Sequence, residues 1–332
     1  MRSQRVAVWG LGGHAIRNIL PALAATNGVE LYGVCSRTES TVGSCAQKWN
    51  CKGWTEPEPM LIDKNVDIIF LATPIGLHFE HGMRVLAAAK HFWCEKPLTC
   101  RLTDTLELLE LSRSKRVSVC EGHMYLHHPQ FRRILDYVRG GSVGRVVSIG
   151  CRFGIPRLEQ ETFRSDPLRG GGALFDVGCY PVSAIEALFP DQQMEVSYAV
   201  IGTREGSAVD TDGHAIIALS NAVRVHLEWR INCAYRNEID IWGEKGSIFS
   251  DKVFSKSPDH VPEFRLRNAQ GVEKTEYGST GDHFSLMLQY FLGTVSDMES
   301  AEEERSRIAR RAEVLERIAR GAGYPVNRRQ GE

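Results

Sequence analysis

The 332-residue chain lacks a strong net charge, a long apolar run and any internal repeat or low-complexity linker. Its 40 lysine and arginine residues nearly balance 41 aspartate and glutamate residues, which leaves a net charge of −1. This balance gives no reason to expect nucleic acid or an anionic membrane as a partner. No apolar segment approaches the roughly 20 residues that a membrane helix needs. The length allows two domains and a substantial core.

The nine cysteines are an odd number and contain neither a C-x-x-C pair nor a zinc-type spacing. Several lie within apolar runs, as Cys35, Cys94 and Cys120 do, which is typical of reduced core residues. The first apolar run is also interrupted early, at Gly10, which argues against a secretory signal. We therefore expect a cytoplasmic protein without disulfides.

Three histidines lie close together in the sequence, at His123, His127 and His128. The first two are four residues apart, but a strand-to-helix transition is expected between them. No glutamate-containing zinc motif accompanies them, so no metal site is predicted.

The first 122 residues alternate between short apolar runs and segments with a helical pattern. Apolar runs predict strands at 5–9, 29–35, 66–72, 91–94 and 117–120. Helical patterns lie at 15–25, 40–49, 77–89 and 104–114. Alternation at this spacing predicts a parallel, doubly wound sheet of the Rossmann type. We expect this domain to span residues 1–122.

After about residue 122 the pattern changes to a period of two. Polar residues separate the apolar Val223, Val225, Leu227, Trp229 and Ile231, which predicts a strand with one wet face. Further strands are predicted at 146–153, 195–201, 214–219 and 239–242, mostly without helices between them. Helices are expected near 175–188, 282–292 and 301–319. Residues 123–332 are therefore predicted to form an α+β domain with an antiparallel or mixed sheet.

A glycine-rich turn follows the first predicted strand and opens the first helix. It is built from Gly10, Gly12, Gly13, His14 and Ala15 around Leu11. The first glycine permits the tight turn and the second lets the backbone approach a pyrophosphate, while Ala15 allows helix and strand to pack closely. Because the helix N-terminus then faces the phosphates, the turn predicts a dinucleotide site.

The end of the second predicted strand favours NADP(H) over NAD(H). An acidic residue there would bind the ribose 2′-hydroxyl of NAD, whereas this chain has Ser36, Arg37 and Thr38. A hydroxyl and a guanidinium suit a 2′-phosphate, although a solvated loop arginine is the alternative.

The third strand ends where doubly wound sheets place ligands. The residues that follow it there, Ala72, Thr73 and Pro74, are candidate cofactor contacts. His78 opens the next helix, and it either contacts the cofactor or caps and packs there.

The end of the fourth strand carries Glu95, Lys96 and Pro97, about eighty residues after the glycine turn. Reduction of a ketone needs a donor for the charge that grows on the carbonyl oxygen. The compact ammonium of Lys96 is the natural candidate, since its pKa falls when it is buried near the cofactor. Glu95 is expected to hold Lys96 or to contact the nicotinamide ribose, and a cis Lys96–Pro97 bond is expected.

These segments resemble the glucose–fructose oxidoreductase / inositol dehydrogenase / rhizopine catabolism (Gfo/Idh/MocA) family. The matching segments are GLGGHA at 10–15, ATPIGLH at 72–78, CEKPLT at 94–99 and GGGALFDVGCYP at 170–181. The resemblance covers essentially the whole chain. It implies a Rossmann domain followed by an α/β domain with an open, mostly antiparallel sheet, and an active site between that sheet and the nicotinamide.

One branch of the family is similar in more detail. Many members have histidine where this chain has Tyr180, and those with tyrosine include sugar and dihydrodiol dehydrogenases and some nucleotide-sugar ketoreductases. EGHMYLHHPQ at 121–130 resembles the branch pattern E-x-x-M-Y-x-x-H-P-Q, with His123 in place of the usual apolar residue. Residues 235–247 and 251–254 look similar to sugar 3-ketoreductases that act on nucleotide-linked deoxysugars.

The resemblance implies further site residues. Tyr180 is a second candidate donor, and Asp176, four residues earlier on the same helix face, would bind a substrate hydroxyl or tune Lys96. The alternatives are a packing aromatic for Tyr180 and a helix-terminus stabiliser for Asp176. Arg164 is expected to reach a phosphate or to form a salt bridge. Substrate contacts are expected from Tyr125, Arg152, Phe163, Tyr180, Tyr235 and Asn237, with less support for Tyr277 and His283.

The sequence therefore predicts NADPH-dependent reduction of a keto sugar, plausibly at C3 of a nucleotide-linked deoxysugar, by a homodimer or homotetramer. One alternative is an NADP-dependent dehydrogenase of a free sugar or a cyclic trans-dihydrodiol. Another is a non-catalytic NADP-binding regulator, against which the intact Lys96, Tyr180 and Asp176 argue.

Replacement of Arg37 by alanine is expected to weaken NADPH binding, because the guanidinium would no longer neutralise the 2′-phosphate. Titration of the purified variant with NADPH measures this. An affinity equal to that of the wild-type protein would rule out the assignment of Arg37.

Overall fold

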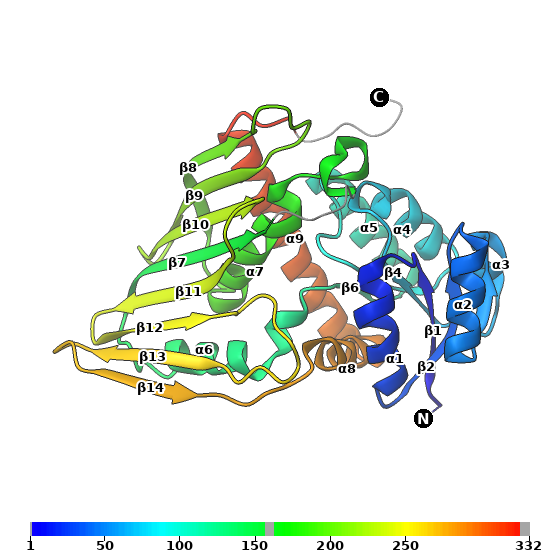
Figure 1. Ribbon diagram of the computed structural model, residues 1–332, viewed down its shortest axis with the longest axis horizontal. Coiled ribbons are helices and arrows are strands. Elements are labelled where there is room, and N and C mark those ends of the chain that lie inside the picture. The colour runs from blue at the N-terminus through cyan, green and yellow to red at the C-terminus, as the bar shows by residue number, and fades with distance from the viewer. Residues whose placement is uncertain (1, 157–162, 326–332) are drawn as a thin grey trace. The chain divides into compact units, whose positions relative to one another are not determined.

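The computed structural model describes residues 2–156 and 163–325 of the chain (Figure 1). It contains two compact units: Met1–His123 with Phe284–Ala309, and Met124–His283 with Arg310–Glu332. The sequence analysis expected two contiguous domains, whereas residues 284–309 return to the first unit. They do so because their apolar side chains pack there: the ring centroid of Phe291 lies 5.6 Å from that of Trp93, and Ile308 joins the core cluster.

The first unit contains a six-stranded sheet in the order β3-β2-β1-β4-β5-β6. Its strands are β1 (Gln4–Trp9), β2 (Val29–Cys35), β3 (Lys52–Trp54), β4 (Ile68–Leu71), β5 (His91–Cys94) and β6 (Val119–Glu121). All five pairs are parallel, which confirms the predicted doubly wound sheet. The sequence analysis missed β3, whose three residues include only one large apolar side chain.

Helices lie between these strands in the sequence, and two more return to the unit from the C-terminal part of the chain. They are a π-helical segment Ala15–Ile19, α1 (Leu20–Ala25), α2 (Glu39–Trp49), α3 (Pro57–Ile62), α4 (His78–Ala87), α5 (Leu102–Lys115), α8 (His283–Ser296) and α9 (Met298–Gly321), of which α9 continues into the second unit. Pro21 lies inside a helix that runs without a break from Gly13 to Ala25, directly after its π-helical turn. π-helical turns are among the places where a helix accommodates a local irregularity.

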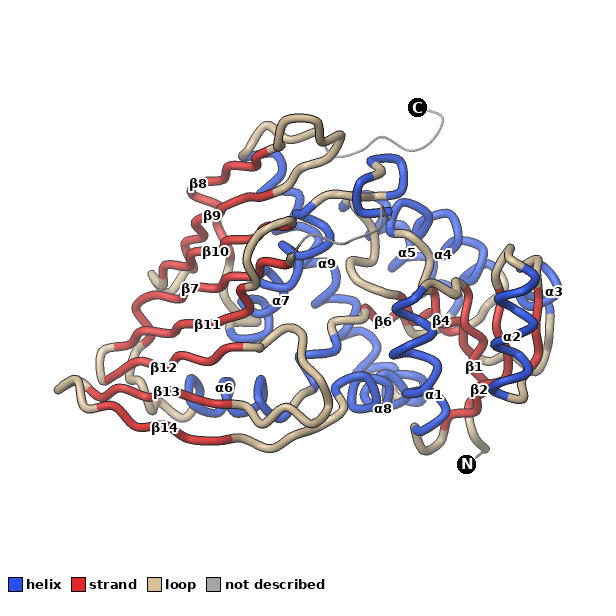
Figure 2. The backbone as a smooth tube through the Cα atoms, viewed as in Figure 1, coloured by secondary structure: helices blue, strands red, loops and turns tan. Residues whose placement is uncertain are grey.

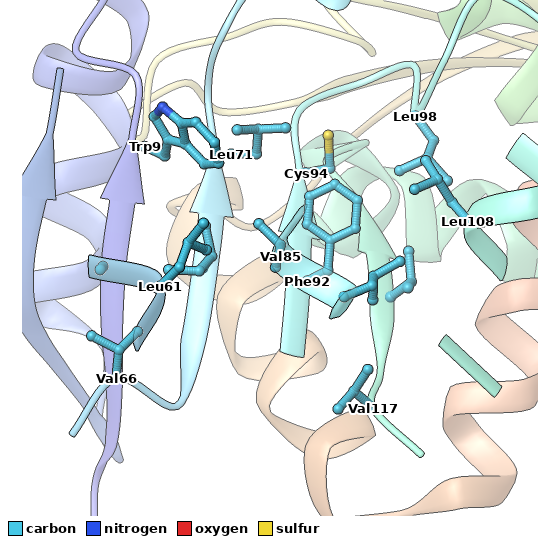
Figure 3. Packing of buried hydrophobic residues seen from close by; sticks show 14 of the residues in the cluster. Trp9, Leu61, Val66, Leu71, Val85, Phe92, Cys94, Leu98, Leu108 and Val117 are labelled. Atoms are coloured by element: carbon cyan, nitrogen blue, oxygen red, sulfur yellow. The ribbon is translucent and has the colours of Figure 1, made fainter. Parts of the chain in front are cut away.

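The core of the first unit lies between the sheet and its helices (Figure 3). Val6, Ile69 and Phe92 come from neighbouring strands and have no exposed surface. Strands of a parallel sheet are covered on both faces, which explains why they read as continuous apolar runs in the sequence. Their carboxyl ends, at Trp9, Leu71 and Cys94, are paired in register, so the loops that follow them leave from one edge.

The second unit contains an eight-stranded sheet in the order β14-β13-β12-β11-β7-β10-β9-β8 (Figure 2). Its strands are β7 (Val146–Ile155), β8 (Met194–Gly202), β9 (Asp212–Leu219), β10 (Arg224–Ile231), β11 (Arg236–Gly243), β12 (Gly246–Asp251), β13 (Glu263–Asn268) and β14 (Glu273–Tyr277). Only β7 and β10 are parallel to each other, so the predicted mostly antiparallel sheet is confirmed.

One face of this sheet is covered by α7 (Cys179–Leu188), which contacts β7 and β10. The unit also contains α6 (Pro129–Arg139). The sequence analysis missed β12, β13, β14 and α6. Strands β13 and β14 are rich in charged residues, because most of their side chains face solvent. No helix among the described residues has the length and apolar character required to cross a membrane.

A lysine without a nearby carboxylate is largely buried in the loop between β12 and β13. The Nζ atom of Lys256 donates a hydrogen bond to the carbonyl oxygen of Val253 at 2.7 Å. Burial lowers the pKa of Lys256 to about 7. Burial, with the neighbouring Lys256 and His260, also lowers the pKa of His128 to about 4. This region therefore holds basic groups that are disfavoured in their charged forms.

Replacement of Lys256 by methionine is expected to stabilise the protein. The amine has a pKa of about 7 when folded and 10.5 as the reference value, so the folded state loses stability as the pH falls from 10.5 to 7. We expect Lys256→Met to raise the unfolding free energy by roughly 1–3 kcal/mol at pH 7, and by less near pH 9.5. Urea unfolding at both pH values measures this. Lys252→Met, at an exposed neighbour, is the matched control, and a destabilised or pH-independent Lys256→Met would contradict the prediction.

Candidate active site

The glycine turn follows β1 and has room on its outer side. Gly10 has a φ of +109°, and a Cβ there would lie 2.6 Å from the carbonyl carbon of Ala72, so only glycine fits. A Cβ on Gly12, in contrast, would meet no heavy atom within 4 Å. Gly12, Gly13 and His14 are exposed, and the helix begins at Gly13, with the Ile16 N–H donating to the Gly12 carbonyl oxygen at 3.1 Å. Unbonded N–H groups at a helix start beside open space suit a diphosphate, so the residues fit a dinucleotide.

The loop after β2 lies at the same edge. Ser36 is partly exposed and its N–H donates to the carbonyl oxygen of Trp54 at 3.1 Å. Arg37 and Thr38 are exposed, and α2 begins directly after them. The loops that carry these residues, the glycine turn and Thr73 all follow neighbouring strands. The sheet therefore brings the predicted cofactor contacts of the first unit to one edge.

The segment after β5 is held from one side by His78. This ring has no exposed surface, and its Nδ1 atom lies 3.0 Å from the carbonyl oxygen of Pro97 and 3.2 Å from that of Leu98. Its Nε2 atom lies 2.9 Å from the carbonyl oxygen of Thr73. Burial lowers the pKa of His78 against the opposing effect of these carbonyl groups. Both ring nitrogens thus lie within hydrogen-bond distance of backbone carbonyl oxygens, and a neutral ring donates from one of them, as in the packing alternative.

The same segment is held from another side by the end of β6. The Oε1 atom of Glu121 accepts a hydrogen bond from the Leu98 N–H at 2.7 Å. The Nε2 atom of His123 lies 3.3 Å from Oε2 of Glu121, and both side chains are buried. The Lys96–Pro97 peptide bond is cis, as the sequence analysis expected. Sequence reasoning assigned no role to Glu121, although it lies in the segment that carried the family resemblance.

Glu95 is ionised beside Lys96. Its Oε1 atom lies 3.2 Å from the Nε2 atom of His14 in the glycine turn. Burial raises the pKa of Glu95, but His14, Lys96 and His78 outweigh this effect and lower the pKa of the carboxyl. A carboxylate next to an ammonium favours the charged form of both groups. An ionised carboxylate therefore lies directly before Lys96 in the chain, at the edge where the cofactor contacts gather.

In the second unit, Tyr180 and Asp176 lie on a helix that begins as a π-helical segment, Leu174–Gly178, and continues as α7. The carboxylate of Asp176 is buried and forms an ion pair with Arg164. The ring of Tyr180 packs against Phe153, with centroids 5.0 Å apart, and its hydroxyl lies 3.8 Å from the sulfur of Met124. Arg164 therefore forms the salt bridge that the sequence analysis gave as an alternative.

Asp210 holds the start of this helix. Its Oδ2 atom accepts from the Leu174 N–H at 2.7 Å, and its Oδ1 atom accepts from the Tyr324 hydroxyl at 2.9 Å. A Cβ on Gly172 would lie 2.0 Å from Oδ1 of Asp210, so this approach requires glycine. Asp210 and Tyr324 were missed by sequence reasoning. Nothing in the local pattern indicates that Asp210 binds Leu174, 36 positions earlier, or that Tyr324 binds Asp210, 114 positions earlier.

Two of the predicted substrate contacts are committed to the protein. The hydroxyl of Tyr125 bonds to the Tyr180 carbonyl oxygen at 3.1 Å and to Ser183 Oγ at 2.7 Å. The amide of Asn237 accepts from the Phe254 N–H at 2.7 Å and donates to a backbone carbonyl oxygen at 2.8 Å. Both side chains fix the surroundings of Tyr180 rather than facing open space.

The other predicted contacts differ in exposure. Tyr235 is 46% exposed, and its hydroxyl donates to the Ser255 carbonyl oxygen at 3.2 Å. Phe163 is partly exposed beneath the Arg164 guanidinium. Tyr277 is 71% exposed at the end of β14, whereas His283 is buried.

Arg152, which was predicted to contact the substrate, does not share a face of the sheet with Tyr180. Arg152 forms ion pairs with Glu228 at 3.1 Å and Glu238 at 3.2 Å, its neighbours on β10 and β11. The next residue, Phe153, contacts Tyr180 from the face that α7 covers. Because side chains alternate along a strand, Arg152 projects from the opposite, open face. Among the described residues, no group of three histidine, cysteine or acidic side chains is arranged to hold a metal ion.

Comparison with known proteins covers both units. Residues 4–123 match the family described as "Oxidoreductase family, NAD-binding Rossmann fold", and residues 131–249 match the "GFO/IDH/MocA C-terminal domain". The chain is 27% identical to the dTDP-3,4-didehydro-2,6-dideoxy-alpha-D-glucose 3-reductase of Streptomyces violaceoruber, over 100% of this chain and 91% of that protein. It is 30% identical to the enzyme of the same name from Saccharopolyspora spinosa, over 81% of each chain.

A solved structure is similar over nearly the whole chain. The 3-ketoreductase from Actinomadura kijaniata, in complex with NADP and TDP-benzene, matches with a TM-score of 0.90 and 28% identity, over 96% of this chain and 98% of that one. The doubly wound sheet, the glycine turn and the held lysine define an oxidoreductase with an NAD(P)-binding Rossmann domain. The chain belongs to the Gfo/Idh/MocA oxidoreductase family, as its sequence motifs indicated.

Proposed function

We propose that the chain is an NADP(H)-dependent reductase of a keto sugar carried on a nucleoside diphosphate, acting at C3. The observation that carries this proposal is the segment at Lys96, which two buried side chains clamp and an ionised carboxylate flanks. The printed activities of the relatives, dideoxyglucose 3-reductases, support the sugar and the position of reduction. The crystallised 3-ketoreductase, which binds NADP and TDP-benzene, supports the cofactor and a nucleotide-linked substrate.

Residues of the first unit would hold the cofactor, and we propose 1–122 as the cofactor-binding region. The N–H groups of the glycine turn would bind the diphosphate, and Ser36, Arg37 and Thr38 would bind the 2′-phosphate. Thr73 and Pro74 line the same edge. When bound, the cofactor supplies the hydride that reaches the carbonyl carbon. The chain itself supplies orientation and the proton.

The proton is proposed to come from Lys96 to the carbonyl oxygen. Glu95 keeps the ammonium charged, so the donor is ready when negative charge develops on that oxygen. Tyr180 is the second proposed donor, and residues 123–332 form the proposed substrate-binding region. The separation of these two residues in the sequence supports this pair. The 3-ketoreductase from Actinomadura kijaniata was also crystallised with a lysine replaced by alanine and with a tyrosine replaced by phenylalanine. Those two residues are 84 positions apart, as Lys96 and Tyr180 are here.

We further propose that the protein forms a homodimer or homotetramer through the open face of the second sheet. Three large apolar side chains on this face are strongly exposed: Trp242 at 61%, Tyr198 at 51% and Val200 at 45%. Cross-strand pairing places them on the same side as Arg152. An exposed apolar surface of this kind is typical of an interaction site.

Replacement of Lys96 by alanine is expected to lower kcat by about 10²- to 10⁴-fold, because the general acid is removed. Tyr180→Phe, which keeps the ring and its packing, isolates the contribution of the phenol. Steady-state reduction of a nucleotide-linked 3-keto sugar with NADPH measures both. Turnover of Lys96→Ala close to that of the wild-type protein would exclude Lys96 as the donor. A silent Tyr180→Phe would leave Lys96 as the sole donor.

A nucleoside diphosphate is expected to stabilise the NADP⁺-saturated protein against heat. A ligand at about 100 times its Kd contributes roughly 2.7 kcal/mol. A thermal-shift titration with thymidine diphosphate and uridine diphosphate measures the effect and identifies the base. The Lys96→Ala variant should show the same shift, since Lys96 is proposed to act on the sugar ketone. Stabilisation by NADP⁺ without any shift from either nucleotide would instead favour a free-sugar or diol dehydrogenase.

A further inference from the structure

His14 connects the glycine turn to the segment that carries Lys96. Its Nε2 atom lies 3.2 Å from Oε1 of Glu95, and its Nδ1 atom lies 3.0 Å from Nδ2 of Asn18, one turn further along the helix. The side chain of His14 is 46% exposed and that of Glu95 is 17% exposed. The contact thus lies at the rim of the site, between two loops at the same sheet edge.

The partners of the ring determine its tautomer. The amide nitrogen of Asn18 can only donate, so Nδ1 of His14 accepts and the ring proton lies on Nε2. That proton is directed at the Glu95 carboxylate, which can only accept when ionised. A neutral ring therefore satisfies both contacts, and Asn18 orients His14 for Glu95.

Glu95 is confined on its other side by the backbone at Gly122. A Cβ on Gly122 would lie 3.3 Å from the Cα atom of Glu95 and 3.6 Å from its Oε2 atom. The absence of a side chain there lets Glu95 pass close to the backbone. His14 therefore contacts Oε1 of the carboxylate, while Oε2 lies on the side of Gly122.

The contact of His14 with Glu95 differs from the two other contacts that hold this segment, those of His78 and Glu121; all three are called ties below. His78 and Glu121 are buried and bind backbone groups of residues 97 and 98. His14 binds a side chain, is half exposed, and belongs to the turn that is proposed to bind the diphosphate. Of these three ties, it is therefore the one that a molecule in the glycine turn would touch directly.

We propose that His14 is a positioning residue: it fixes the Glu95 carboxylate beside Lys96 and links occupancy of the glycine turn to the orientation of the proton-donating segment. The proposal rests on the proposed function, because it assigns Lys96 the role of donor. It extends that function by giving His14 a task other than a cofactor contact. Without His14, Glu95 would move away from the position that favours a charged Lys96.

A double-mutant cycle on kcat tests the coupling. His14→Leu is expected to lower kcat by roughly 10-fold, since a small misplacement of a catalytic group has effects of this order. The affinity for NADPH should fall by a smaller factor, because the link between the two loops is reciprocal. His14→Gln, which can still donate to Glu95 but cannot titrate, should restore most of the activity. In a Glu95→Leu background, His14→Leu should have almost no further effect, because the interaction is already absent.

Two kinetic results would overturn the proposal. Equal losses of kcat from His14→Leu in the wild-type protein and in the Glu95→Leu variant would mean that His14 and Glu95 act independently. A weaker NADPH affinity with unchanged kcat would mean that His14 only contacts the cofactor.

A readout without turnover separates this proposal from the proposed function. In ¹⁵N spectra of the imidazole groups, the His14 ring is expected to be protonated at Nε2 in the wild-type protein and to lose this preference in Glu95→Leu. NADP⁺ should shift the same signals. Identical His14 signals in the two proteins would overturn the proposed tie. If the protein binds NADPH but reduces no keto sugar while the signals behave as expected, the proposed function fails and the tie remains.

Discussion

The hydrogen bonds that clamp residues 97 and 98 are the constraint on which the arrangement of the first unit depends. His78 contributes from the start of α4 and Glu121 from the end of β6, and both are buried. A buried polar group that loses its partner costs about 1–3 kcal/mol, so each of these contacts resists any displacement of the segment. The clamp acts on the backbone and not on the lysine. The backbone next to Lys96 is thus placed by the fold.

In the second unit, buried side chains hold the helix that carries Tyr180, whereas in the first unit they hold the segment that follows a strand. Asp210 accepts from the Leu174 N–H at the start of the helix and from the Tyr324 hydroxyl near the end of the described chain. Tyr125 bonds to the carbonyl oxygen of Tyr180 from another direction. In both units, the groups that hold the site are buried and bind backbone atoms. Substitution of a holding residue should therefore affect stability and activity together, whereas loss of an acting residue should affect activity alone.

Sequence reasoning identified the parts of the site that local chemistry dictates. A glycine turn after an apolar run predicts its own structure, and the ends of β1, β4 and β5 could be located because fully buried parallel strands give continuous apolar runs. It could not identify partners that only the tertiary structure brings together. The bond from Glu121 to Leu98 spans 23 positions, and the bond from Tyr324 to Asp210 spans 114. The face of Arg152 could not be identified for another reason: the strand was predicted correctly, but its direction of alternation depends on which face α7 covers.

The charged surroundings of Lys96 differ from those of Lys256. Lys256 has a carbonyl partner and basic neighbours, so burial alone sets its pKa at about 7. Lys96 is next to Glu95, whose own pKa is lowered despite burial because cationic and imidazole groups surround it. A lysine that must hold its proton until a substrate arrives needs the second environment. A free-standing buried lysine would release its proton near neutral pH and would serve better as a base than as a donor. The carboxylate beside Lys96 therefore favours a site built for reduction of a carbonyl group.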